Sequence, residues 1–181
     1  KSSGGDYTSL SAWEAGQQGD LVSADEIRQA ECDNFEDTTA CVFAGSTTDA
    51  TRYMRAYAAQ AHGGVYGTAS YRLKTAPSGD NQVVYVNQAY TRLEGLLINM
   101  NGDDNNNHGI GVAPSVEARI DRCITKNGLA SPTYGNSNYG INGLTDRSAN
   151  LYISTCLVLW AFGATKTNVF GIRTVNHTSG K

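Results

Sequence analysis

The sequence predicts an all-β fold in which short parallel strands stack into a solenoid. A pattern of alternating polar and apolar residues occurs three times, at residues 92–98, 119–125 and 152–158. The copies are unevenly spaced, with 27 positions from Leu93 to Ile120 and 33 from Ile120 to Ile153. A constant strand pattern with a variable spacer is typical of stacked coils joined by loops of unequal length.

A second, shorter pattern supports the same fold. It pairs an aromatic residue or His with Gly and Ile, and it accompanies the main copies at residues 108–112, 139–141 and 170–172. Each coil is therefore expected to contain at least two strands, stacked on equivalent strands about 4.8 Å away.

Equivalent positions of the three copies are expected to point inward together, because alternate side chains of a strand lie on one face. A one-residue bend at Gly95, Arg122 and Thr155 is expected to interrupt the alternation. The expected inward sets are Thr91, Ala118 and Leu151; Leu93, Ile120 and Ile153; Leu96, Cys123 and Cys156; and Ile98, Thr125 and Val158.

With these repeats, with the opening at residues 6–16 and with residues 47–53, the chain resembles the right-handed parallel β-helix (pectate-lyase-like) repeat proteins of bacteriophage virions and bacterial surfaces. The resemblance covers most of the chain and implies a right-handed parallel β-helix. It also implies a location on a virion, on a cell surface or outside the cell. It implies no single activity, because β-helices serve as lyases, hydrolases, adhesins and phage spikes.

Residues 1–20 are expected to form an N-terminal cap with a short helix, and residues 21–181 the β-helix. Ser11 and Glu14 fit a capping box at the start of a helix over residues 12–18, and Gly19 suits its end. Such a helix would cover the open end of the first coil, where an unpaired strand edge invites further pairing. An ordinary surface helix is the alternative.

Five strands are predicted before the repeats, with Ile27 and Ala30 as the inward positions of the first. They are expected at residues 25–31, 41–44, 52–58, 71–74 and 82–86.

The last coil is expected to be incomplete. The pattern that begins at Phe170 opens another coil, but no further copy of the main pattern follows before Lys181. We expect either a fragment of a longer β-helix, or self-association, further β-helix or a partner subunit at this end, because an uncovered strand edge would otherwise remain.

Composition narrows the class of partner. Charged residues make up 17% of the chain, the net charge is −3, and no basic patch stands out, so nucleic acid is not expected as a partner. No apolar run approaches the roughly 20 residues of a membrane span. The three His residues lie far apart, and no spacing matches a zinc site.

The four Cys residues fall into two pairs. Cys123 and Cys156 are expected to be stacked apolar fillers, with a disulfide or a reactive role as the alternative. Cys32 and Cys41 flank a polar loop and can close it as a disulfide, which would fit an oxidising compartment.

Glu94 and Asp121 form the one candidate catalytic pair. They are expected to point outward on neighbouring strands, about 5 Å apart, as in retaining glycosidases. Arg92 and Arg119, at the adjacent outward positions of the same strands, are expected to neutralise them. The alternative to a catalytic pair is a charge-balanced, solvated sheet face.

Two further groups are candidates for ligand contacts. Asp103 and Asp104 lie in an Asn-rich loop that can offer oxygen ligands to Ca²⁺ or contact a sugar, with a solvated turn as the alternative. Aromatic side chains expected at the surface can contact sugars or a protein partner, or simply pack under loops. These are Tyr134, Tyr139, Tyr152 and Trp160.

No set of nucleophile, base and acid emerges from the sequence. We therefore expect a non-enzymatic structural or adhesion module without a cofactor, exposed on a phage particle (capsid decoration, tail spike or fibre) or on a bacterial surface or extracellular filament. The alternatives are a carbohydrate-active β-helix enzyme, either a polysaccharide lyase or a glycosidase, and a sugar-binding module.

Overall fold

Three parallel sheets dominate the computed structural model, which describes residues 5–75, 82–101, 107–127, 138–143, 150–159 and 169–173. Sheet I contains β1 (Arg28–Cys32), β4 (Met54–Ala58), β7 (Thr91–Glu94), β10 (Ala118–Asp121) and β13 (Leu151–Ser154). Sheet II contains β2 (Glu36–Asp37), β5 (Arg72–Thr75), β8 (Leu97–Met100), β11 (Ile124–Asn127) and β14 (Leu157–Leu159). Sheet III contains β3 (Cys41–Phe43), β6 (Gln82–Val86), β9 (His108–Val112), β12 (Asn138–Gly143) and β15 (Val169–Arg173).

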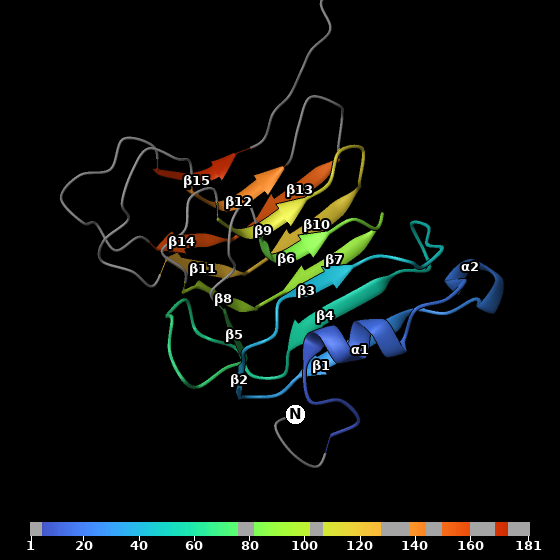
Figure 1. Ribbon diagram of the computed structural model, residues 1–181, viewed down its shortest axis with the longest axis horizontal. Coiled ribbons are helices and arrows are strands. Elements are labelled where there is room, and N and C mark those ends of the chain that lie inside the picture. Colours follow the sequence, from blue (N-terminus) through green and yellow to red (C-terminus); the bar gives the residue numbers. More distant parts are fainter. Residues whose placement is uncertain are drawn as a thin grey trace, which may run out of the picture.

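Each strand pairs with the strand that comes three places later in the chain, and all these pairings are parallel (Figure 1). The chain thus visits the three sheets in turn, and three consecutive strands are called a coil below. This arrangement confirms the predicted mostly-β fold of stacked parallel strands, and it is compatible with a parallel β-helix solenoid.

The strand register confirms the repeat pattern position by position. Ile120 pairs with Leu93 on one side and with Ile153 on the other, and Thr125 pairs with Ile98 and Val158. In sheet III the shorter pattern aligns in the same way, with Tyr139 between its equivalents in β9 and β15. Equivalent inward side chains therefore stack on one another and build the core.

A single residue in the left-handed conformation turns the chain from sheet I into sheet II. Gly95, Arg122 and Thr155 have φ angles of 66°, 50° and 52°. They occupy the bend positions that the sequence predicted. The turn lets the inward pattern continue from one sheet to the next without a loop.

We expect Gly95→Ala to lower the free energy of unfolding by about 1 kcal/mol, because an L side chain is strained at this φ. The added Cβ would meet only the Cβ of Ala58, at an ordinary 3.7 Å, so crowding is not the cause. The matched change Thr155→Gly removes a β-branched side chain from the same conformation and should raise stability by about 0.5–1 kcal/mol. Urea unfolding of both variants measures the effect, and equal stability of Gly95→Ala and the parent would contradict it.

Burial is nearly complete in the middle coils and decreases at the last one. Leu93, Ile120 and Cys123 have no exposed surface. Ile172, in register with the buried Ile141, is 46% exposed, and Ile153 is partly exposed. Among the described residues, the inward positions of the fifth coil are therefore the least covered.

The first strand departs from its prediction. It begins at Arg28 rather than at residue 25, and Ile27, expected to point inward, is 44% exposed. Asp25 ends the short helix α2 (Leu21–Ala24) in the left-handed conformation, which displaces the strand start. Ala30 is buried as expected.

The N-terminal helix α1 (Leu10–Gly16) is present but begins two residues earlier than predicted. Ser9, not Ser11, is its N-cap and accepts a hydrogen bond from the Ala12 N–H at 3.0 Å. The expected capping box is wrong because Glu14 faces away from the helix start. Its carboxylate is buried and accepts the Ala44 N–H at 2.9 Å, just after β3.

Helix α1 lies across the first coil (Figure 1). Two buried acids, Glu14 and Asp37, hold it there. Asp37 of β2 accepts the N–H of Leu10 at 2.8 Å and the hydroxyl of Tyr71 at 2.7 Å. Trp13 packs edge-on against Phe43 of β3 at 6.4 Å. The helix therefore covers the outer edges of β2 and β3, the first strands of sheets II and III.

The change Asp37→Asn should cost about 2 kcal/mol, because it replaces one carboxylate oxygen by a donor and leaves buried groups without an acceptor. Urea unfolding measures the loss, and limited proteolysis should show earlier cleavage near α1. Glu26→Gln, at an exposed acid paired with Arg28, is the control and should change little. Equal effects of the two changes would show that Asp37 does not hold the helix.

Candidate functional site

The outer face of sheet I carries two parallel files of side chains. The register places one file on Gln29, Arg55, Arg92, Arg119 and Tyr152, and the other on Glu31, Tyr57, Glu94, Asp121 and Ser154. Glu94 and Asp121 are therefore direct neighbours in paired strands, at the positions that the sequence analysis considered for catalysis.

The arginines that neutralise these acids differ from the predicted ones. Arg55 binds both carboxylate oxygens of Glu94, at 2.9 and 2.5 Å, and Arg122 lies 3.5 Å from Glu94 and 3.3 Å from Asp121. The hydrogen bond with Glu94 raises the pKa of Arg55.

The two arginines expected in this role have other partners. Arg92 lies over the ring of Tyr53, 3.5 Å from its centre, and Arg119 is 3.9 Å from Glu117. Arg122 could not be assigned from strand alternation, because it sits at the bend and its direction depends on the left-handed backbone.

Each carboxylate oxygen of this pair has a partner on a neighbouring side chain. Arg55 occupies the two oxygens of Glu94, while Ser154 donates to Oδ1 of Asp121 at 2.8 Å and Arg122 faces Oδ2. A retaining glycosidase needs one carboxylate free to attack and another free to transfer a proton. The arrangement therefore fits a charge-balanced face better than a catalytic pair.

A cavity of about 470 Å³ adjoins this cluster at the turn from sheet I to sheet II. We call it the corner pocket. Its lining includes Tyr57, Glu94 and Arg122 from the coils, and His62 with neighbouring Ala and Gly residues from the segment between β4 and β5.

His62 connects the segment between β4 and β5 to the turn at Arg122 by hydrogen bonds. Its Nδ1 accepts the N–H of Gly64 at 2.9 Å, so its Nε2 carries the proton and donates to the carbonyl of Arg122 at 2.5 Å. Both ring nitrogens are thus used within the protein. Sequence reasoning missed His62, because nothing in the local pattern indicates that residues 59–64 contact a coil two repeats later.

The aromatic candidates separate into buried, exposed and undescribed residues. Tyr139 is buried, contrary to expectation, because it packs beside His108 at 5.2 Å and its hydroxyl accepts from Arg173. Tyr152 is 53% exposed, as a surface contact requires. The remaining candidates lie outside the described residues; these are Tyr134, Trp160, Asp103 and Asp104.

Cys32 and Cys41 are buried free thiols, so the structure does not contain the disulfide that the sequence suggested. Burial raises the pKa of Cys32 to about 12 and also raises the pKa of Cys41. Cys123 and Cys156 stack as predicted. A hydrogen bond between their thiols raises the pKa of Cys123 and lowers the pKa of Cys156, which is partly exposed.

Iodoacetamide should therefore modify Cys156 first in the native protein at pH 8, because thiolate is the reactive form. Peptide mapping by mass spectrometry should show Cys32, Cys41 and Cys123 protected until the protein unfolds. In denaturant without reductant all four should react. Protection of Cys32 and Cys41 under those conditions would instead reveal a disulfide.

Neither a metal cluster nor a membrane helix is found in the described part of the chain. No group of three or more His, Cys, Asp or Glu side chains there is placed to hold a metal ion. No helix among those residues is long and apolar enough to cross a membrane.

Comparison with known proteins adds no assignment: no family model, curated protein or solved structure matches the chain. The resemblance to β-helix repeat proteins therefore depends on the repeats and on the three parallel sheets.

Proposed function

We propose that the chain is a right-handed parallel β-helix of the pectate-lyase-like kind and acts as a non-enzymatic structural or adhesion module. The observation that carries this proposal is the engagement of Glu94 and Asp121, whose four carboxylate oxygens all bind Arg or Ser side chains. The face that looked most like an active site is thereby a stabilised, charge-balanced surface.

Exposure on a phage particle, as capsid decoration, tail spike or fibre, or on a bacterial surface or extracellular filament, is the setting that we propose. A stack of parallel coils buries each coil against the next and suits a rigid extended structure. The partly exposed Ile153 and Ile172 support self-association, further β-helix or a partner subunit at the C-terminal end.

Sugar binding without catalysis is the second candidate. It is favoured by the exposed ring of Tyr152, with Arg119 5.3 Å from its centre, and by the corner pocket on the same face. An aromatic ring beside hydrogen-bonding groups can stack on a sugar ring.

Two measurements test the main proposal. Purified protein incubated with acidic and neutral polysaccharides should release neither reducing ends nor unsaturated products. Gold-labelled antibodies against the protein should decorate intact cells or phage particles of the encoding organism.

Cleavage that disappears in the double variant Glu94→Gln, Asp121→Asn would overturn the proposal in favour of an enzyme. Binding on a glycan array that is lost in Tyr152→Ala, with no cleavage, would favour the sugar-binding candidate. Glu26→Gln, at an exposed acid that contacts neither Glu94, Asp121 nor Tyr152, is the control.

A further inference from the structure

Strand β1 is the first strand of sheet I, and among the described residues no strand lies beyond it. The N–H of Arg28 donates to the carbonyl of Tyr53, and the carbonyl of Cys32 accepts from the N–H of Ala59. The backbone groups of Arg28 and Cys32 therefore face β4. Backbone groups of alternate residues in a parallel ladder point to opposite edges. The N–H and C=O groups of Gln29 and Glu31 therefore face away from β4, toward the N-terminal end.

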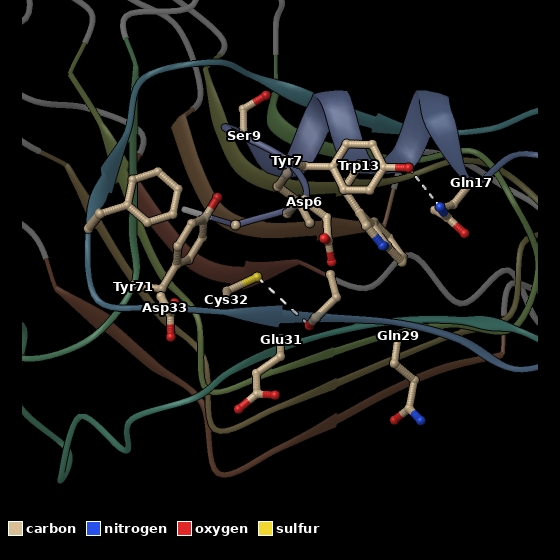
Figure 2. A pocket seen from close by; sticks show the side chains of 14 residues that line it. Asp6, Tyr7, Ser9, Trp13, Gln17, Gln29, Glu31, Cys32, Asp33 and Tyr71 are labelled. Carbon is tan, nitrogen blue, oxygen red and sulfur yellow. Dashed lines mark hydrogen bonds between the residues drawn. The ribbon is translucent and has the colours of Figure 1, made fainter. Parts of the chain in front are cut away.

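A cavity of about 580 Å³ lies along this free edge, between β1 and helix α1 (Figure 2). Tyr7 and Trp13 line it on the helix side, and Cys32 points into it from β1, while the side chain of Glu31 points away from the helix. We call this cavity the edge groove. It joins backbone groups of Gln29 and Glu31, which have no strand partner among the described residues, to an aromatic wall. These are the two elements that recognise an extended peptide by strand addition.

Helix α1 restricts what can enter. Leu10 of the helix donates to Asp37 of β2, and Glu14 accepts from Ala44 just after β3, so the N-terminal edges of sheets II and III are covered. A second copy of the chain would need all three sheet ends open to stack a whole coil there. Among the described residues, the edge of β1 has no strand beside it, which fits one added strand and not another coil.

The charge of the edge groove indicates the chemistry of that strand. Three acids are among its lining residues, Asp6, Glu31 and Asp33, and this lining contains no Lys or Arg. The exposed side chain of Glu31 points to the outer face of sheet I, where the outward residues of an added strand would lie. Complementary charges favour and orient association. The apolar side chains of its lining, Trp13 and Phe35 among them, suit alternating apolar residues.

We propose that the edge groove binds an extended basic peptide segment of a partner protein, which adds a strand to β1. Backbone hydrogen bonds to Gln29 and Glu31 supply the pairing. The acids select Lys or Arg at every second position, and the aromatic wall receives the residues between them. This inference is independent of the proposed function, because it concerns the opposite end of the stack.

The test measures binding to the full chain by a fluorescein-labelled peptide of about seven residues that alternates Lys and Val, followed by anisotropy. Backbone methylation of the peptide nitrogens at alternate positions keeps its charge and removes its pairing donors. We expect this to weaken binding about tenfold or more, since several hydrogen bonds are lost. A Glu–Val peptide should not bind, and added salt should weaken the Lys–Val complex.

Gln29→Pro removes one free-edge donor without breaking the ladder to β4, and it should weaken binding about fivefold or more. Gln29→Ala, the matched control, keeps the donor and should stay within about twofold. Both variants must keep the parent unfolding temperature, and where Gln29→Pro does not, the methylated peptide decides.

Equal binding of the methylated and parent peptides would overturn the proposal. So would a dimer of the chain that Gln29→Pro dissociates, because the edge would then belong to a second copy.

Discussion

Parallel strand pairing in register is the constraint on which the rest of this structure depends. Each backbone ladder holds equivalent residues of successive coils at one height, so the side chains of Leu93, Ile120 and Ile153 form one continuous file. A shift of one residue in any coil would turn its inward set outward. Stability is thus shared between neighbouring coils.

The same register produces the charged outer face. Because outward positions also align, Glu94 lies beside Asp121 on the paired strand. Two neighbouring negative charges repel each other unless cations lie close to them. Arg55 comes from the preceding coil and Arg122 from the turn, so the balance is made across three strands. The resulting cluster stabilises the surface and leaves both carboxylates occupied.

The two ends of the stack are unlike each other. At the N-terminal end, Asp37 and Glu14 use buried carboxylates to hold α1 over β2 and β3, while the edge of β1 adjoins an open groove. In the last described coil, Ile172 is exposed at a position where its neighbour Ile141 is buried. An assembly built from this chain would therefore use different contacts at its two ends.

The sequence by itself determined the strand class, the inward files and the bends at Gly95, Arg122 and Thr155, because period-two alternation and a one-residue break are local signals. Only the tertiary structure decided the direction of the Arg122 side chain, the burial of Tyr139 and the contact of His62 with Arg122. Each of these depends on residues from another coil, brought together by the register. Likewise, the sequence predicts that Glu14 caps its own helix, but its carboxylate accepts the N–H of Ala44. Only the packing of α1 on the first coil brings these two groups together.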